Sequence, residues 1–176
     1  MHLELRRLSD VASADLIALM NHPRVRRHLP LARGEFGPAE CATFVANKEA
    51  LWHEHGYGPW AFVIDGTFAG WGGLQPEGDD ADLALVLHPR FWGHGKMVCD
   101  HVIARAFSEL GLTSVTILLP PSRGGGHAIR RLGFTPDGET EIAGERFLRY
   151  RLRPAVHRGP TGTARAGGGQ GLRGSS

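Results

Sequence analysis

The stretch HPRFWGHGKM, residues 88–97, places two glycines among basic side chains, a combination that suits the binding of an anion. Gly93 and Gly95 stand two positions apart, after the apolar run 83–87 and before a segment with helical periodicity. The flanking side chains that are basic or can become so are Arg90, His94 and Lys96. The start of a helix presents unpaired backbone N–H groups and the positive end of the helix dipole, and glycine lets an anion approach this backbone closely. Residues 93–97 therefore predict a phosphate cradle, although a strand-to-helix turn without a ligand also fits.

The glycine spacing differs from two common nucleotide-binding motifs. A dinucleotide fingerprint needs a third glycine, and a P-loop needs Gly-Lys followed by Ser or Thr. Here Met97 follows Lys96, and the strands expected before the stretch are antiparallel. The sequence therefore argues against a dinucleotide enzyme.

Hydrophobic periodicity and turn residues predict the elements around this stretch. Asp65-Gly66 is a two-residue hairpin turn, and the connection from Leu87 to Val115 is long enough to cross over between parallel strands. We expect strands at residues 3–8, 60–64, 67–74, 82–87, 114–120, 133–136 and 146–152. We expect helices that begin near Ser13 and at Pro38, helices at 95–110 and 126–132, and a turn at 136–145. The sequence thus predicts an α+β, or mixed α/β, fold whose sheet has six or seven strands.

Length and composition predict one folded domain, residues 1–153, followed by a disordered Gly/Arg-rich tail, residues 154–176. The tail holds three arginines and no acid, so the net charge of +2 becomes −1 without it. A near-neutral folded part predicts no direct nucleic-acid binding. Because no apolar run could span a membrane and no signal peptide is evident, we expect a cytoplasmic protein that contacts no membrane. We expect free thiols at Cys41 and Cys99, and no metal site.

Several motifs, taken together and in this order, resemble the GNAT superfamily of N-acetyltransferases. Arg90-x-x-Gly93-x-Gly95 is similar to the Arg/Gln-x-x-Gly-x-Gly/Ala motif with which that family binds the pyrophosphate of acetyl-CoA. DLALVLHPRFWGHG resembles the pattern E-I-G-Y-x-L-x-P-x-x-W-G-x-G, and AIRRLGF resembles the family's L-E-K-L-G-F box. The resemblance covers roughly residues 3–152 and is greatest to the branch of bacterial ribosomal-protein alanine acetyltransferases. It implies a GNAT-type acyl-CoA N-acyltransferase fold, with a mostly antiparallel sheet, about four helices and a splayed parallel pair at strands 4 and 5.

The resemblance also implies which positions bind acetyl-CoA, the expected co-substrate. These positions are Val86, Leu87, His88, Arg90, Trp92, Gly93, His94, Gly95, Lys96, Met97 and Ser122. Many members carry Asn-x-x-Ser after the fifth strand, where this chain has Ser122 and Gly125. Other members place a general-acid Tyr where this chain has Ile129. One of Arg123, Arg130 and Arg131 could meet the CoA 3′-phosphate, although solvent-facing charges are the simpler interpretation.

Acetyl transfer from a thioester to an amine needs a neutral amine, a stabilised oxyanion and a leaving thiolate. Asp82 is the first candidate for the base, acting through a water, because it begins the strand on which histone-acetylating relatives place a glutamate; an exposed turn acid is the alternative. Glu35, in the loop expected to border the acceptor, is the second candidate, and Ser122 is a candidate for assisting the thiolate. A backbone N–H near Val86 or Leu87 could stabilise the oxyanion if a bulge splays this strand from the next.

The sequence leaves the acceptor and the assembly open. The acceptor would be a protein N-terminal α-amine or a small-molecule amine. An α-amine, with a pKa of roughly 7.7–8, needs a weaker base than a lysine amine with a pKa near ~10.4. Ser122, Gly125 and Ile129 differ from the residues that many family members carry at these positions. A second interpretation is therefore an inactive acyl-CoA-binding sensor or partner module of the same fold. We expect a monomer or a homodimer.

Overall fold

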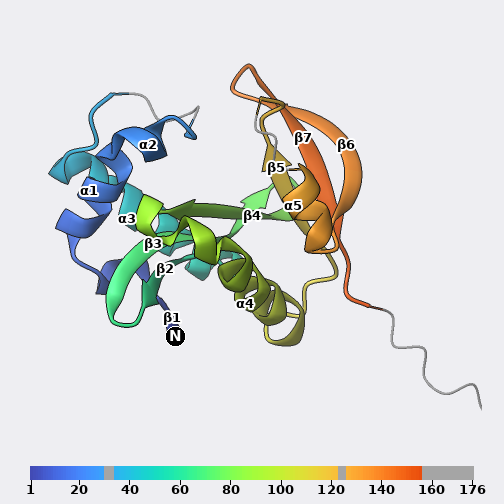
Figure 1. The fold of residues 1–176 in the computed structure, drawn as a ribbon, viewed down its shortest axis with the longest axis horizontal. Coiled ribbons are helices and arrows are strands. Elements are labelled where there is room, and N and C mark those ends of the chain that lie inside the picture. Colours follow the sequence, from blue (N-terminus) through green and yellow to red (C-terminus); the bar gives the residue numbers. More distant parts are fainter. Residues whose placement is uncertain (30–33, 123–125, 156–176) are drawn as a thin grey trace, which may run out of the picture.

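Seven strands form one mixed sheet in the order β1-β2-β3-β4-β5-β7-β6 (Figure 1). The computed structural model describes residues 1–29, 34–122 and 126–155. The strands are β1 Leu3–Arg6, β2 Pro59–Ile64, β3 Thr67–Glu77, β4 Asp80–Leu87, β5 Val115–Leu119, β6 Thr135–Ile142 and β7 Glu145–Leu152. The helices are α1 Ser13–Asn21, α2 Pro23–Arg26, α3 Pro38–His55, α4 Gly95–Ser108 and α5 Gly126–Arg131, with the 3-10 helices η1 Leu8–Asp10 and η2 Pro89–His94.

Only β4 and β5 pair in parallel; all the other neighbouring strands described are antiparallel. The predicted mixed sheet with its parallel pair at strands 4 and 5 is therefore confirmed. The crossover between these two strands contains η2 and α4. Of the tail expected at residues 154–176, the part from residue 156 on lies outside the described residues, so the boundary at residue 153 stays a prediction.

Local sequence signals explain several of these elements. Asp65 and Gly66 have φ of 47 and 78°, as the hairpin turn between β2 and β3 requires. At the start of α3 the Glu40 carboxylate accepts a hydrogen bond from the N–H of Gly37, at 3.1 Å. Gly56, with φ of 74°, ends the same helix in the left-handed conformation.

The C-terminal hairpin differs from the prediction. β6 continues to Ile142, so most of the segment 136–145, expected as a turn, is strand. The turn itself is Ala143-Gly144, whose residues have φ of 51 and 80°. Pro136 and Gly138 indicated a turn because of their composition, but they lie at a register shift within the β6–β7 pairing. A bulge uses the same residue types as a turn, which is why local composition misled the prediction.

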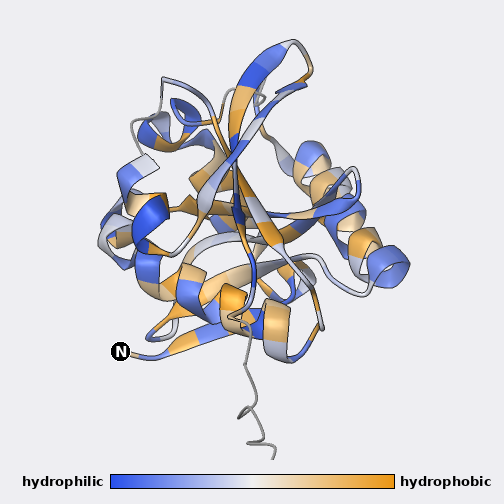
Figure 2. Cartoon of the chain, turned by 90° about the vertical axis from the view of Figure 1, so that its right-hand side faces the viewer, coloured by the Kyte–Doolittle hydropathy of each residue, from blue (hydrophilic) through white to orange (hydrophobic). Residues whose placement is uncertain are grey.

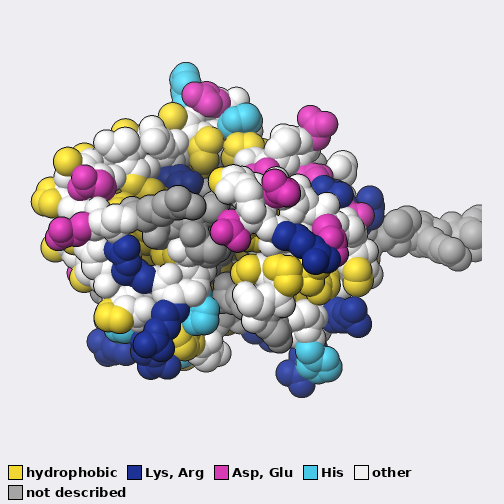
Figure 3. Space-filling view, turned by 90° about the horizontal axis from the view of Figure 1, so that it is seen from above, with side chains coloured by type: hydrophobic (Ala, Val, Ile, Leu, Met, Phe, Trp, Pro, Cys, Tyr) yellow, Lys and Arg dark blue, Asp and Glu magenta, His cyan; other side chains and the backbone are white. Residues whose placement is uncertain are grey.

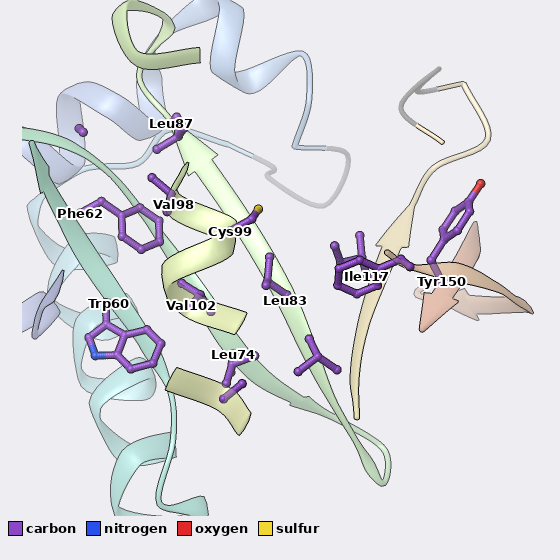
Figure 4. Packing of buried hydrophobic residues seen from close by; sticks show 14 of the residues in the cluster. Trp60, Phe62, Leu74, Leu83, Leu87, Val98, Cys99, Val102, Ile117 and Tyr150 are labelled. Atoms are coloured by element: carbon purple, nitrogen blue, oxygen red, sulfur yellow. The ribbon is translucent and has the colours of Figure 1, made fainter. Parts of the chain in front are cut away.

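The sheet carries a hydrophobic cluster on each face, and β4 contributes to both. Hydrophobic and hydrophilic residues alternate along the helices, as expected for helices that cover a sheet (Figure 2). Val86 belongs to the cluster with α1, α2 and α3, whereas Leu83 and Leu87 belong to the cluster with α4. Figure 4 shows α4 packed through Val98, Cys99 and Val102 against this second face. Side chains of even-numbered and odd-numbered β4 residues therefore face different layers.

Candidate functional site

β4 and β5 meet at one end only and then separate. Their single paired position is Asp82 with Thr116, near the start of both strands. Figure 4 shows the two strands diverging from that end. The expected splay is therefore present, but the bulge expected to cause it is wrong, because β4 stays in continuous register with β3 along its whole length. The gap comes from divergence of the two strands and not from an extra residue.

Backbone groups at the open end of β4 point into this gap. The N–H of His88 donates to the carbonyl of Ala69 on the β3 side, at 2.8 Å. Backbone groups of successive strand residues point to opposite sides, so the groups of Val86 also face β3 and those of Leu87 face the gap. The Leu87 carbonyl accepts a hydrogen bond from the Trp92 indole, at 2.9 Å. Of the two N–H groups considered for the oxyanion, that of Leu87 is the one turned toward the gap.

The N-terminus of α4 lies beside the open end of β4 and has the properties of an anion site. Its N-cap residue, His94, makes no capping hydrogen bond, and the first turn holds no acid. Gly95 has a helical φ of −55°, and a Cβ there would lie 3.5 Å from Leu85, an ordinary contact. A Cβ at Gly93 would meet nothing within 4 Å. The fold itself therefore has room for a Cβ at both positions, and Gly93 leaves open space beside the start of α4.

A buried nitrogen adds to this picture. Nδ1 of His94 is buried and has no hydrogen-bond partner among the described residues. A buried polar atom without a partner costs free energy, which a ligand could recover. The open space at Gly93, the uncapped N-terminus of α4 and Nδ1 of His94 together fit the phosphates of a CoA-type molecule.

A cavity of ≈ 340 Å³ lies between α2 and the open end of β4, and we call it the loop cavity. Its lining residues are Val25, His28, Leu29, Leu85, Val86, Leu87, Trp92 and Gly95. Trp92 is 40% exposed, with the Arg24 guanidinium 4.5 Å and the His28 ring 5.7 Å from its ring centroid. Sequence reasoning missed the α2 side of this cavity, because no local motif marks α2 as a neighbour of η2.

Basic side chains lie on the elements that border the loop cavity. α2 carries Arg24 and Arg26, and Figure 3 shows Lys and Arg side chains gathered on the lobe formed by the N-terminal helices. Arg90 is exposed, with its guanidinium near the Phe91 ring. Lys96 pairs with Asp100 at 2.6 Å on the exposed side of α4. These charges favour an anionic ligand through their combined field.

The remaining predicted CoA positions take different places. Nδ1 of His88 accepts from the N–H of Arg90 at 3.2 Å, and burial lowers the pKa of His88. Met97 is half-buried against the α4-side cluster. Ser122 is exposed in the turn after β5, and Arg130 and Arg131 are exposed on α5. Gly125 and Arg123 lie outside the described residues.

A second cavity, of ≈ 640 Å³, contains Asp82, and we call it the Asp82 cavity. Its lining residues are Met20, Leu29, Phe44, Asn47, Lys48, Trp71, Gln75, Pro76, Glu77, Asp82, Ala84, Val86, Leu118, Ile142 and Phe147. Asp82 therefore shares its side of β4 with Ala84 and Val86, as period-two alternation predicts. Glu35 is exposed and lines neither cavity, so its role as a base stays a prediction.

The environment of Asp82 tunes its carboxyl group. Thr116 Oγ1 donates to Asp82 Oδ1 at 3.1 Å, and the backbone N–H of Leu118 also donates to this carboxylate. Burial outweighs these bonds and, with the nearby carboxylates of Glu77 and Asp80, raises the pKa of Asp82 to about 7. A carboxyl group with this pKa can take up and release a proton near neutral pH.

The closed end of the gap is held by an ion-pair network around Arg151. Its guanidinium donates to both carboxylate oxygens of Asp80, at 2.6 and 2.9 Å. It also donates to Asp137 at 2.8 Å and to Ser114 at 2.9 Å. Arg151 is 12% exposed, so these bonds lie largely out of solvent. The network joins β4, β6 and β7 and fixes the point from which β4 and β5 diverge.

Neither a metal-binding cluster nor a membrane-spanning helix is found among residues 1–29, 34–122 and 126–155. Within these ranges, no group of three or more His, Cys, Asp or Glu side chains is arranged to hold a metal ion. The helices described there are too short or too polar to cross a lipid bilayer.

The sheet opens between β4 and β5, the N-terminus of α4 lies beside the open end of β4, and the cavity that contains Asp82 adjoins the loop cavity there. The family described as "Acetyltransferase (GNAT) domain" matches residues 2–135 of this sequence, so the chain belongs to the GNAT acetyltransferase family. Members of this family use acetyl-CoA as co-substrate.

Solved structures with different acceptors share the fold. An acetyltransferase from Agrobacterium tumefaciens is 22% identical with a TM-score of 0.66, over 86% of this chain and 90% of that chain. A protein assigned as a ribosomal-protein-serine acetyltransferase from Vibrio cholerae is 19% identical with a TM-score of 0.65, over 88% and 95%. A variant of the spermidine N-acetyltransferase from Vibrio cholerae is 14% identical with a TM-score of 0.61, over 86% and 93%. At these identities the likeness concerns the fold and does not select an acceptor.

Proposed function

We propose that the protein is an acetyl-CoA-dependent N-acetyltransferase that moves the acetyl group directly to a primary amine in a ternary complex. One observation carries this proposal: the loop cavity and the Asp82 cavity adjoin at β4, and Val86 and Leu29 line both of them. A thioester held from the loop side and an amine held from the Asp82 side would therefore approach one another where β4 and β5 part.

The residues on the loop side are suited to hold and polarise the thioester that acetyl-CoA supplies. The N–H groups at the start of α4, with His94, would hold the phosphates. The N–H of Leu87 faces the gap and would donate to the acetyl oxygen as negative charge develops there. A thiolate with a parent pKa near ~8.5 leaves readily, so the exposed Ser122 need not protonate it.

The pKa of Asp82 bears on the acceptor. An acceptor amine must lose a proton before it attacks, and Asp82 would take this proton through a water. A carboxyl group with a pKa of about 7 is well matched to an α-amine, whose pKa is roughly 7.7–8. A lysine-type amine has a pKa near ~10.4, which exceeds that of Asp82 by more than about three pH units, and proton transfer to Asp82 would then cost about 4 kcal/mol. We therefore propose an α-amine, or an amine of similar acidity, as the acceptor.

An inactive acyl-CoA-binding module is the second candidate, favoured by two observations. Ser122 is exposed, and Ile129, at the position of the family's tyrosine, packs against the α4-side cluster. The position of the Asp82 carboxyl group favours the enzyme instead, because it lines a cavity that adjoins the loop cavity at β4.

Thiol release from acetyl-CoA separates the two candidates. Purified protein is incubated with acetyl-CoA and a panel of amino acids, N-terminal peptides, monoamines and polyamines, and acetylated products are identified by mass spectrometry. We expect amine-dependent CoA release with one acetylated product class. Tight acetyl-CoA binding without amine-dependent release for any member of the panel would support the inactive module.

A further inference from the structure

We propose that Lys48 of α3 selects acceptors that carry an acidic group at a distance from the reacting amine. The inference rests on the proposed function, because it concerns the acceptor side of the same site. Lys48 lines the Asp82 cavity but plays no part in the chemistry described above. A half-buried ammonium group in a substrate-sized cavity therefore needs its own explanation.

The contacts of Lys48 hold its charge without neutralising it. Its Nζ donates to the side-chain oxygen of Gln75. The same Nζ lies 5.4 Å from the ring centroid of Trp71 and 5.6 Å from that of Phe44. Aromatic faces and an amide oxygen orient an ammonium group but leave its full positive charge in place.

The described residues place no carboxylate within 4.0 Å of this ammonium group. The stretches outside the description, residues 30–33, 123–125 and 156–176, contain no Asp or Glu. Glu49, the next residue of α3, pairs instead with Arg7 at 2.6 Å. Burial lowers the pKa of Lys48, which means that its charged form is under-compensated. An anionic ligand would supply the missing partner.

Lys48 and Asp82 lie at separate points of the cavity wall, one on α3 and one on β4. The wall also carries the aromatic residues Phe44, Trp71 and Phe147, and a second acid, Glu77, whose charge acts on Asp82. An acceptor that places its amine near Asp82 and its acidic group near Lys48, with an apolar body between, satisfies both ends. We therefore infer an amino carboxylate or an acidic peptide N-terminus. A polyamine would bring a second ammonium group toward Lys48, which disfavours that class.

Matched acceptors test the inference. Each set contains an acidic, a neutral and a cationic member on one scaffold, such as peptide amides that differ only in Asp, Asn or Lys at the second position. An ω-amino acid with the corresponding alkylamine and diamine extends the range. For the scaffold that turns over, we expect kcat/KM of the acidic member to exceed that of the neutral member by about tenfold, the effect of one charge-assisted contact.

Three variants show whether Lys48 causes the preference. Lys48→Met keeps the apolar stem and should bring the ratio close to one, mainly through KM. Lys48→Arg retains the charge and should retain the preference. Arg105→Met removes an exposed charge from α4, across the sheet, and should change nothing. Thermal melting checks that each variant is folded.

Other results would overturn the inference. These are a wild-type preference for neutral or cationic members, a ratio unchanged in Lys48→Met, or acetylation of Lys48 itself, which peptide mapping by mass spectrometry locates. If no amine turns over, the proposed function fails separately. Calorimetry of the same acceptors with CoA present then decides the role of Lys48: tighter binding of acidic members to wild type than to Lys48→Met supports it, and equal binding refutes it.

Discussion

The two ends of β4 are built in opposite ways. At the closed end, Arg151 satisfies Asp80 with two hydrogen bonds and ties β4 to β6 and β7. At the open end, the backbone of Leu87 faces a gap and an uncapped helix begins nearby. At the closed end the polar groups bind one another and hold the strands together. At the open end the polar groups remain available for a ligand. The comparison suggests that a rigid closed end allows the open end to remain unpaired.

Asp80 and Asp82 show the same contrast in two residues of one strand. The hydrogen bonds from Arg151 lower the pKa of Asp80, whereas burial raises the pKa of Asp82 to about 7. Two positions along the strand thus separate a structural anion from a titratable group. Their partners differ: Arg151 of β7 brings a positive charge to Asp80, whereas Thr116 of β5 gives Asp82 only a neutral hydrogen bond, which burial outweighs.

Exchanging these acids for amides should have the largest effects. We expect Asp82→Asn to lower kcat by about 100-fold or more, because a positioned base contributes 10²–10⁴-fold. In the wild type, kcat should rise with pH through about 7 as Asp82 ionises, and the variant should lose this limb. Initial rates between pH 5.5 and 9 measure both effects. An unchanged rate and pH profile would remove Asp82 from the mechanism.

The same pair predicts stability changes of opposite sign. Because the folded pKa of Asp82 is raised from 3.8 to about 7, its ionisation opposes folding, and stability falls as pH rises through that window. Asp82→Asn should therefore stabilise the protein at pH 8, by on the order of 1–3 kcal/mol after allowance for partial exposure. The folded pKa of Asp80 is lowered, so its contribution is present above its unfolded value and Asp80→Asn should destabilise at pH 8. Urea unfolding at pH 4 and pH 8 distinguishes the signs.

Removing the closed-end arginine should lower stability. Arg151→Met leaves two partly buried carboxylates, Asp80 and Asp137, without this partner, and we expect a loss of about 2–4 kcal/mol in the free energy of unfolding. Arg146→Met, which breaks an exposed pair with Glu139, is the matched control and should cost under ~1 kcal/mol. Equal losses in the two variants would show that the closed end is no stronger than an ordinary surface pair.

Local chemistry made part of this fold predictable. Asp65-Gly66 indicated its hairpin because both residues tolerate positive φ, and the start of α4 at Gly95 followed from periodicity. The continuation of β6 beyond Pro136 to Ile142 was missed because a bulge and a turn use the same residue types. The cause of the splay was also wrong, since divergence of two strands leaves no mark in the sequence of either one.

In the candidate site, too, local sequence marks some residues, whereas others depend on contacts between distant segments. The glycines and Asp82 could be picked out because a motif and an alternation marked them. The pKa of Asp82 could not, since it depends first on how deeply the fold buries this side chain, beside Thr116 from a strand 34 residues away. Lys48 and Gln75 meet across 27 residues, and Arg151 and Asp80 across 71. Contacts between distant segments decide which polar residue is structural and which is available, and a single sequence does not contain them.

The two glycines of the open end provide the mildest and most specific test. Both have room for a Cβ, and Gly95 has a helical φ, so Gly93→Ala and Gly95→Ala should leave stability unchanged or raise it by about 0.5–1 kcal/mol. A methyl group at Gly93 fills space that is open in this structure, and one at Gly95 alters the wall of the loop cavity beside Leu85, so acetyl-CoA affinity should fall by about tenfold, or ~1.4 kcal/mol. Thermal melting and calorimetric titration measure the two quantities on the same samples. Gly111→Ala, at the far end of α4 where φ is 65°, is the reverse control: it should lose stability and keep its affinity. If the Gly93 and Gly95 variants bind acetyl-CoA as wild type does, the open end of β4 does not hold the phosphates, and its unpaired groups need another explanation.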